Sequence, residues 1–306
     1  MKVIVTGGAG FIGSHLVDTL ILAGANVHVL DNLISGQIEQ VNEKAKLHVV
    51  DICSEQARRI LLEVKPDVIF HLAAQADVGK SIQDPLYDAD VNIKGTINML
   101  EASRQANVKK FIFASTSAVY GSLNKDLIFE EEPTLPASYY GLSKLTAEYY
   151  IKLYSELYAQ PYTILRYANV YGPRQLPKGE GGVISVFLNR MREEDILNVH
   201  GDGEQTRDFI YVTDIVSANI AALSLGNKET IQVSTSKRTS INTILNHLSS
   251  IHGSPLQTVF TEPRKGDIKH SCLSNTKAYQ LLNWHPEVDI LNGLIETYNF
   301  YNKNSL

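Results

Sequence analysis

Cysteine is scarce in this chain of 306 residues, which contains only Cys53 and Cys272. The two stand far apart, and neither has a cluster of histidines or further cysteines beside it. This scarcity argues against a disulfide framework and against structural zinc, and we predict no metal site. It fits a reducing compartment, so we expect a cytoplasmic protein.

Long apolar runs and blocks of basic residues are missing as well. No run approaches the roughly 18 apolar residues of a membrane-spanning helix, and glycines from residue 7 onward argue against a secretory signal at the start. Lys and Arg total 28 against 33 Asp and Glu, a formal net charge of −5. Because no basic cluster provides the footprint of nucleic-acid binding, we expect neither a nucleic-acid nor a membrane partner.

What the chain does contain is a regular alternation of short apolar runs and helical patterns. Apolar residues make up 44% of the sequence, and the length favours two domains. The compact apolar runs are residues 2–6, 27–30, 47–50, 68–73, 111–116 and 162–167. Because parallel strands joined by crossover helices are buried on both faces, this alternation predicts an α/β fold with a doubly wound parallel sheet of the Rossmann type.

The sequence changes character after Tyr167. Residues 167–182 carry two prolines and four glycines, which predicts a long loop where the chain leaves the sheet. We expect a domain boundary here. Residues 1–168, rejoined by part of 208–235, would form the doubly wound domain, and residues 169–306 a smaller C-terminal α/β lobe.

Glycines directly after the first strand predict a dinucleotide site. Gly7 permits a tight turn, Gly10 lets the backbone approach a diphosphate, and Gly13 lets the following helix pack closely on the strand. Asp31 ends the second strand. Its carboxylate can accept hydrogen bonds from the adenosine ribose but repels a 2′-phosphate, so the pattern predicts NAD rather than NADP.

A tyrosine and a lysine are candidates for acid–base chemistry. Tyr140 and Lys144 stand four residues apart in a helical pattern and therefore share one face. A neighbouring ammonium lowers the pKa of a phenol, which makes the tyrosine usable as a base near neutral pH. Tyr139 is the weaker candidate because Ser143, four residues beyond it, carries no charge.

Hydroxyl side chains end the predicted strand 111–116. Ser115 and Thr116 stand at its carboxyl end and are followed by Ser117. Parallel sheets bind ligands at this edge, so we expect these hydroxyls at the site.

Several segments, in order along the chain, carry a family resemblance. They are TGGAGFIG (6–13), DNL (31–33), DI (51–52), HLAAQ (71–75), VNIKGTINMLEA (91–102), the hydroxyl strand, the YxxxK pair, LRYANVYGPRQ (165–175), RDFIYVTDI (207–215) and PRKGDI (263–268). With these motifs the chain resembles an extended short-chain dehydrogenase/reductase. Within that superfamily it is similar to the UDP-glucose 4-epimerases, and the likeness covers essentially the whole chain.

The resemblance implies NAD as the cofactor, bound by the first domain. Asp51 and Ile52 correspond to adenine contacts, and Asn92 to a side chain that supports the cofactor from a neighbouring helix. The other implied cofactor positions are Gly7, Gly10, Phe11, Ile12, Gly13, Asp31, Asn32, Leu72, Ala73, Ala74, Gln75, Ser115, Tyr140, Lys144 and Tyr167.

The resemblance also implies an isomerase mechanism with Thr116, Tyr140 and Lys144 as catalytic residues. Tyr140 would remove the proton from the sugar 4-hydroxyl while C4 passes its hydride to NAD⁺, and Thr116 would hydrogen-bond the same oxygen. Lys144 corresponds to the lysine that holds the nicotinamide ribose. The 4-keto sugar would then turn over and receive the hydride on its opposite face.

A UDP-sugar is the implied substrate, bound by the second domain. The implied contacts are Thr116, Asn169, Gly182, Val183, Asn198, His200, Arg207, Arg264, Asp267 and Ser271. Independently of the family, the guanidinium groups of Arg207 and Arg264 match a diphosphate, which can accept two parallel hydrogen bonds from each fork.

Two further expectations come from the resemblance alone. Ser271 is a small residue at the position that gates the sugar pocket, which implies that UDP-N-acetylhexosamines are accepted beside UDP-glucose and UDP-galactose. The family also implies a homodimer through helices near 87–105 and 140–158.

Other functions stay open at this point. A UDP-glucuronate 4-epimerase or decarboxylase begins with the same oxidation at C4, and a non-catalytic dinucleotide sensor is a different class that usually lacks Tyr140 or Lys144. A 4,6-dehydratase needs an Asp-Glu pair after the catalytic threonine, where this chain has Ser117 and Ala118. A reductase would normally use NADPH, which Asp31 opposes.

Overall fold

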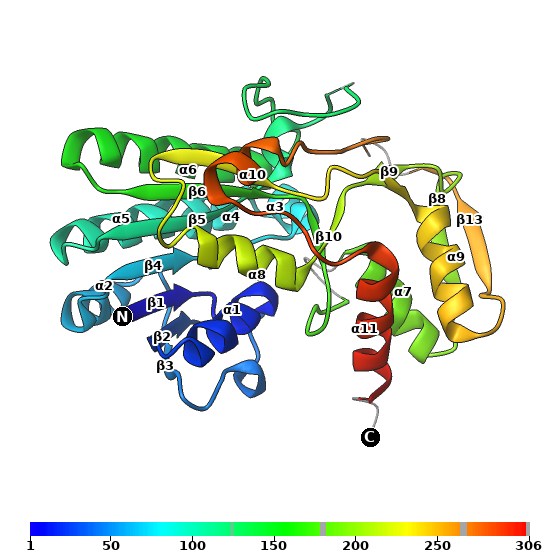
Figure 1. Ribbon diagram of the computed structural model, residues 1–306, viewed down its shortest axis with the longest axis horizontal. Coiled ribbons are helices and arrows are strands. Elements are labelled where there is room, and N and C mark those ends of the chain that lie inside the picture. The colour runs from blue at the N-terminus through cyan, green and yellow to red at the C-terminus, as the bar shows by residue number, and fades with distance from the viewer. Residues whose placement is uncertain (124, 178–181, 264–267, 304–306) are drawn as a thin grey trace.

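The computed structural model describes residues 1–123, 125–177, 182–263 and 268–303. Seven parallel strands form its central sheet (Figure 1). In spatial order they are β11 (Glu229–Val233), β6 (Tyr162–Tyr167), β5 (Lys110–Thr116), β4 (Val68–His71), β1 (Lys2–Thr6), β2 (Asn26–Asp31) and β3 (Lys46–Val49). The predicted doubly wound parallel sheet is therefore confirmed.

Helices cover both faces of this sheet because neighbouring strand residues point to opposite sides. On one face α1 (Phe11–Leu22), α8 (Val212–Ala221) and α10 (Thr276–Leu282) pack against the side that includes Val3 and Val5. On the other face α2 (Glu55–Val64), α5 (Gly95–Gln105) and α6 (Tyr139–Tyr158) pack against the side that includes Ile4. The continuous apolar strands thus bury two separate cores.

The strand order reverses between β1 and β4. From β1 the chain adds β2 and β3 on one side, and it then crosses over to add β4 on the other side of β1. The connections at the carboxyl edge include short helices and turns: η1 (Ile38–Gln40), α3 (Val78–Gln83), α4 (Pro85–Ala89), a π-helical turn η2 (Asp90–Lys94) and η3 (Ser117–Tyr120). Open α/β sheets bind ligands at such a reversal, outside the carboxyl ends of the strands.

A second lobe lies beside this edge, at the right of Figure 1. Its helices are α7 (Val183–Arg192), α9 (Ile241–His252) and α11 (Ile290–Lys303). Three two-stranded pairs accompany them: β7 (Asn169–Tyr171) with β10 (Phe209–Tyr211), β9 (Thr206–Arg207) with β12 (Thr239–Ser240), and β8 (Leu197–His200) with β13 (Thr258–Thr261). The lobe has its own apolar core, which includes Phe187, Leu197 and Leu294.

The chain passes more than once between the two parts. After building β7, α7, β8, β9 and β10 it returns to the sheet, where β11 pairs in parallel with β6 from Glu229 to Val233. It then leaves again to form α9 and β13. Among the described residues, no helix is long and apolar enough to cross a membrane.

Candidate active site

A cavity of about 1080 Å³ lies where the carboxyl edge of the sheet faces the second lobe. Residues expected at the cofactor and substrate sites from the sequence line this cavity together. They are Gly7, Gly10, Phe11, Ile12, Gly13, Asp31, Asn32, Asp51, Ile52, Leu72, Ala73, Ala74, Gln75, Ser115, Thr116, Tyr140, Lys144, Tyr167, Asn169, Gly182, Val183, Asn198, His200, Arg207 and Ser271. Arg264 and Asp267 lie outside the described residues.

The glycine turn after β1 is shaped by contacts that leave no room for side chains. A Cβ added at Gly13 would lie 2.1 Å from the carbonyl oxygen of Gly7, and one at Gly7 would lie 2.7 Å from the backbone nitrogen of Ala73. Gly7 also has a φ of +69°, a conformation that glycine adopts readily. Gly10 is the N-cap residue of α1, and having no side chain it cannot accept hydrogen bonds from the first N–H groups of the helix.

Asp31 is held at the end of β2 by two backbone donors. Its Oδ2 accepts from the N–H of Ala9 at 3.0 Å, and its Oδ1 accepts from the N–H of Leu33 at 2.9 Å. The side chain is largely buried, and burial raises the pKa of its carboxyl while the two backbone donors oppose that rise. A carboxylate has about four acceptor sites, so two bonds leave capacity for ribose hydroxyls.

Beneath the cavity, His71 forms a continuous set of hydrogen bonds between three elements. Its Nδ1 lies 2.8 Å from Thr6 Oγ1, and its Nε2 lies 3.0 Å from Thr96 Oγ1, which itself donates to the carbonyl of Asn92. Because the Thr96 proton is already engaged, Nε2 carries the imidazole proton and Nδ1 accepts from Thr6. Burial, with the nearby charge of Lys144, lowers the pKa of His71 to about 3, so the ring is neutral.

Asn92 lies outside the cavity lining and acts on it through the backbone. Its Oδ1 accepts from the N–H of Gln75 at 2.9 Å, while its Nδ2 donates to the carbonyl of Gln75 and to Ser143 Oγ. Asn92 thus joins a loop that lines the cavity to helix α6. In the described geometry it orders the loop after β4 rather than facing the cavity itself.

Helix α6 brings the tyrosine–lysine pair to the cavity. Ser138 caps the helix by accepting from the N–H of Gly141 at 3.1 Å, which fixes its first turn. Lys144 is buried, with its Nζ 4.3 Å from the centre of the Phe113 ring. On the facing wall Thr116 ends β5, and its Oγ1 accepts from the N–H of Ala118 at 3.1 Å. Both Tyr140 and Thr116 line the cavity.

The end of the cavity where we expect the substrate is built from side chains of the second lobe. Asn198 and His200 come from β8, and Arg207 from β9. His200 is oriented by its Nδ1, which lies 2.9 Å from Thr261 Oγ1, and its carbonyl accepts from the side chain of Gln205.

The family model for the "NAD dependent epimerase/dehydratase family" matches residues 3–234 of this sequence. The chain belongs to this family. It is 38% identical to the UDP-glucose 4-epimerase of Mycolicibacterium smegmatis, with the whole of both chains covered. Among solved structures it is similar to the UDP-glucose 4-epimerase of Thermotoga maritima with UDP-glucose, at 43% identity, a TM-score of 0.97 and 99% of each chain covered.

A further epimerase of the family binds a larger sugar. The UDP-N-acetylglucosamine 4-epimerase of Methanobrevibacter ruminantium, in complex with UDP-N-acetylmuramic acid, is 36% identical to this chain with a TM-score of 0.94. The alignment covers 99% of this chain and 98% of that one. The extended short-chain dehydrogenase/reductase fold predicted from the motifs is therefore confirmed for this family member.

The described residues fit the cofactor of the NAD-dependent epimerase/dehydratase family. The turn at Gly7, Gly10 and Gly13 brings the start of α1 to the cavity, and no side chain of the cap accepts from its backbone N–H groups, which suits a diphosphate there. Asp31 stands at the end of β2 with free acceptor capacity, as an NAD ribose requires. When bound, NAD⁺ supplies a reversible hydride acceptor.

Several cavity-lining residues of this epimerase-family chain were not predicted from the sequence. They include Lys80, Tyr87, Gln175 and Arg190. The ammonium of Lys80 lies 4.4 Å from the centre of the Tyr87 ring. One signal was available for Arg190, because it stands seven residues after Val183 on α7 and so shares its helical face. Lys80 is the one basic residue between positions 72 and 93, which is a weaker signal.

Proposed function

We propose that this chain is an NAD-dependent UDP-glucose 4-epimerase that interconverts UDP-glucose and UDP-galactose in the cytoplasm. The observation that carries the proposal is the position of Thr116, Tyr140 and Lys144. All three line the same cavity as the glycine turn of the first part and the side chains of the second lobe. A sugar held there has a hydroxyl group, a phenol and an ammonium around it, beside the cofactor site.

Each of the three residues has a chemical task in this scheme. Tyr140 takes the proton of the sugar 4-hydroxyl as that carbon is oxidised, and Thr116 donates a hydrogen bond to the same oxygen. The positive charge of Lys144 favours the phenolate form of Tyr140. After the resulting 4-keto sugar has turned over and C4 has been reduced on its opposite face, Tyr140 returns the proton to the C4 oxygen.

Turnover of the sugar requires that the rest of the substrate be the anchor. We assign this anchor to Asn198, His200 and Arg207 in the second lobe, together with Arg264 and Asp267. A guanidinium such as that of Arg207 can hold a diphosphate by two parallel hydrogen bonds. Since these contacts reach the nucleotide and not the hexose ring, the sugar stays free to rotate about the diphosphate linkage.

The residues after Thr116 favour epimerisation over dehydration. Ser117 and Ala118 line the cavity at the positions where a 4,6-dehydratase carries an acid–base pair. Neither side chain is ionised near neutral pH, so neither can remove a proton from C5 or protonate the leaving hydroxyl at C6.

We further propose that UDP-N-acetylglucosamine and UDP-N-acetylgalactosamine are substrates. Ser271 lines the cavity, and its small side chain leaves space where a tyrosine would project. The N-acetylhexosamine epimerase from Methanobrevibacter ruminantium, similar over nearly the whole chain, supports this wider substrate range.

A homodimer is part of the same proposal. The outer face of α6 exposes a stripe of large apolar residues at helical spacing. Its members are Leu142, Tyr149, Leu153 and Leu157, which are 49%, 61%, 49% and 62% exposed. Contiguous apolar patches of this kind mark association surfaces.

A Leu142→Glu/Leu153→Glu variant is expected to sediment as a monomer, whereas Leu22→Glu, at an 87% exposed position on α1, is expected to remain dimeric.

Conversion of UDP-galactose by the purified protein tests the proposed activity. The protein is incubated with UDP-galactose in two parallel samples, one without added cofactor and one with NAD⁺, and UDP-glucose is measured. We expect the same final ratio of UDP-glucose to UDP-galactose whether the reaction starts from UDP-galactose or from UDP-glucose. Failure to convert any UDP-hexose or UDP-N-acetylhexosamine, even with NAD⁺ present, would contradict the proposal.

A further inference from the structure

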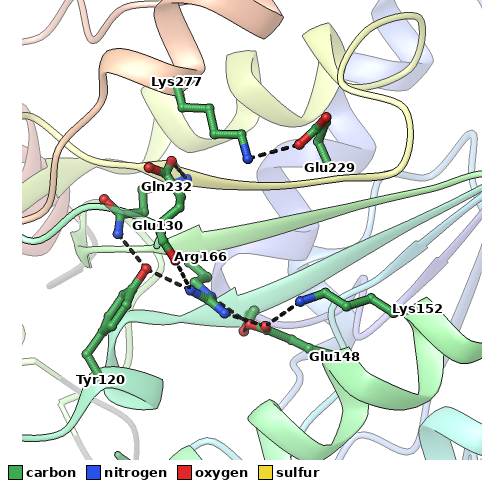
Figure 2. Close-up of polar contacts among 9 residues, drawn as sticks. Tyr120, Glu130, Glu148, Lys152, Arg166, Glu229, Gln232 and Lys277 are labelled. Atoms are coloured by element: carbon green, nitrogen blue, oxygen red, sulfur yellow. Dashed lines mark hydrogen bonds and ion pairs between the residues drawn. The ribbon is translucent and has the colours of Figure 1, made fainter. Parts of the chain in front are cut away.

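A buried ion pair joins helix α6 to strand β6 (Figure 2). Arg166 of β6 donates through Nε to Glu148 Oε1 at 2.9 Å and through Nη2 to Oε2 at 2.6 Å. The exposed fraction of the side chain is 4% for Arg166 and 0% for Glu148. Two full charges are therefore held out of water in a parallel, two-bond geometry.

Three neighbours extend this pair into a cluster. Ser115 of β5 donates its hydroxyl to Glu148 Oε1 at 2.6 Å. The other terminal nitrogen of Arg166 donates to the Tyr120 hydroxyl at 2.7 Å, and the side-chain amide of Gln232 in β11 donates to the same oxygen at 2.5 Å. We call these five residues the Glu148 cluster. It ties α6 to three strands of the sheet and to η3.

The energetics of the Glu148 cluster do not explain it as a source of stability. Removing a carboxylate and a guanidinium from water carries a penalty that their attraction often fails to offset. Apolar residues of similar volume at such positions are often as stable or more stable. What a two-bond guanidinium–carboxylate pair does provide is a fixed distance and angle between the elements that carry it.

Those elements are the ones that carry the proposed catalytic groups. Glu148 follows Lys144 by four residues and Tyr140 by eight, so all three lie along one side of α6. Ser115 directly precedes Thr116 at the end of β5. The hydrogen bond between Ser115 and Glu148 is thus a direct tie between the strand end that presents Thr116 and the helix that presents Tyr140.

We propose that Glu148 and Arg166 are positioning residues that set the separation of Tyr140 and Thr116 through Ser115. The inference rests on the proposed epimerase function. Lys152 also approaches Glu148, with its Nζ 3.9 Å from Oε2, and its side chain is partly exposed. Since displacement of a reacting group by about 1 Å can cost on the order of 100-fold in rate, loss of the tie should appear in kcat.

The main test replaces the charged pair by apolar residues of similar size. A Glu148→Leu/Arg166→Met variant keeps the interior filled, so the melting temperature is expected to stay within a few degrees of the parent value. We expect kcat for UDP-galactose to fall about 10- to 100-fold while KM changes by less than about threefold. A variant that is equally stable and equally fast would overturn the proposal.

A second readout follows Tyr140 without turnover. The pKa of Tyr140 is obtained by ultraviolet difference titration of each protein against its own Tyr140→Phe counterpart. Because Tyr140 and Lys144 both lie on α6, a shift of this helix relative to β5 keeps their separation, and the Tyr140 pKa is expected to stay at the parent value while kcat falls. A shifted Tyr140 titration in the apolar pair variant would show that the substitution disturbs α6 itself, which would contradict a role in setting the separation of Tyr140 and Thr116.

A smaller variant decides the matter if the double variant does not fold. Ser115→Ala removes the hydroxyl that donates to Glu148, and because Ser115 also lines the cavity, bound NAD is measured beside the rate. We expect kcat to fall about tenfold or less, with the NAD content at the parent level and the melting temperature within a few degrees of the parent value. Ser103→Ala is the matched control, since Ser103 is also fully buried and donates to the carbonyl of Met99 on α5, away from the cavity. Parent-like kcat in Ser115→Ala would refute the tie.

The combination of the variants separates the possible failures. If Ser115 acts through Glu148, adding Ser115→Ala to Glu148→Leu/Arg166→Met lowers kcat no further than the apolar pair alone. If the two changes act independently, their fold-reductions in kcat multiply. Multiplying effects would overturn the proposed route through Ser115. Failure of the parent protein to convert UDP-galactose would instead remove the proposed function, an outcome distinct from fast turnover in the variants.

Discussion

The two ends of the cavity are built from different parts of the chain. The end at the glycine turn lies at the carboxyl edge of a seven-stranded sheet and includes a backbone turn in which Gly7 and Gly13 meet neighbouring main chain. The end in the second lobe is made of side chains on short strand pairs, such as Asn198 on β8 and Arg207 on β9. A surface made of backbone changes only if the fold changes, whereas one made of side chains changes by substitution. The cofactor end should therefore tolerate little, and the substrate end should be open to altered specificity.

The largest expected effect lies where the two ends meet. A Tyr140→Phe variant keeps the ring but loses the hydroxyl that we propose transfers the proton, so kcat should fall by a factor on the order of 1,000 or more. The amount of bound NAD should stay at the parent level, since the cofactor end is untouched. Both quantities are measured by the UDP-galactose assay and by release of nucleotide from denatured protein. Activity within a few-fold of the parent value would show that another group is the base.

At the cofactor end, Gly13→Ala should abolish NAD retention. The added Cβ would lie 2.1 Å from the carbonyl oxygen of Gly7, so the turn and α1 must separate. The matched control is Gly24→Ala, which meets nothing within 4 Å. Because Gly24 has a φ of +78°, the control should lose about 1 kcal/mol of stability and keep its NAD. Equal NAD content in the two variants would break the contrast between the two ends.

At the substrate end, Ser271→Tyr should change preference without stopping catalysis. The larger side chain would occupy the cavity that Ser271 lines and should lower kcat/KM for UDP-N-acetylgalactosamine at least about tenfold, while UDP-galactose changes by less than about threefold. Ser271→Ala serves as the control and should keep both activities. Competition kinetics with the two sugars give the ratio directly. A Ser271→Tyr variant that keeps its N-acetylhexosamine activity would refute the gate.

The smallest expected effect concerns the stability of the cofactor end at acid pH. His71 has a folded-state pKa of about 3 against 6.5 when unfolded, so the unfolded chain binds more protons between these values. Stability therefore rises with pH across this window and is lost as the pH falls below about 6.5, by about 2 kcal/mol at pH 5. His71→Gln should show a weaker dependence of melting temperature on pH. Identical pH profiles for the parent and this variant would contradict the assignment.

Much of the first part of the molecule was predictable because its signals are local. Strands β1, β2, β4, β5 and β6 coincide with the apolar runs, and the alternation of strands and helices predicted the parallel sheet. The pairing of β8 with β13 was not predicted, since short strands at residues 197–200 and 258–261 meet only through the fold. Strand β13 carries exposed apolar residues such as Val259, so its sequence shows no pattern of a buried strand.

The candidate site shows the same division. Residues in contiguous motifs, from Gly7 to Lys144, were identified and line one cavity, and their individual roles stay predictions. Glu148 was not singled out, because a glutamate on a long helix resembles a solvated surface charge until Arg166 is placed beside it. Asn92 was expected to support the cofactor from a neighbouring helix; its side chain bonds to the backbone of Gln75 and to Ser143, and it lies outside the cavity lining. Contacts between distant segments depend on side-chain directions that sequence spacing alone does not give.

The return of the chain to β11 has a consequence for how the protein is synthesised. A nascent chain that has emerged only as far as Tyr167 has β6 as an unpaired edge, because the partner strand Glu229–Val233 has not yet been made. It also lacks Gln232, which completes the polar contacts around Tyr120. The dinucleotide half therefore cannot finish folding on the ribosome before the first part of the second lobe, from β7 to β10, has been translated. Exposed strand edges pair readily with other chains, so this interval is when the protein is most prone to aggregate.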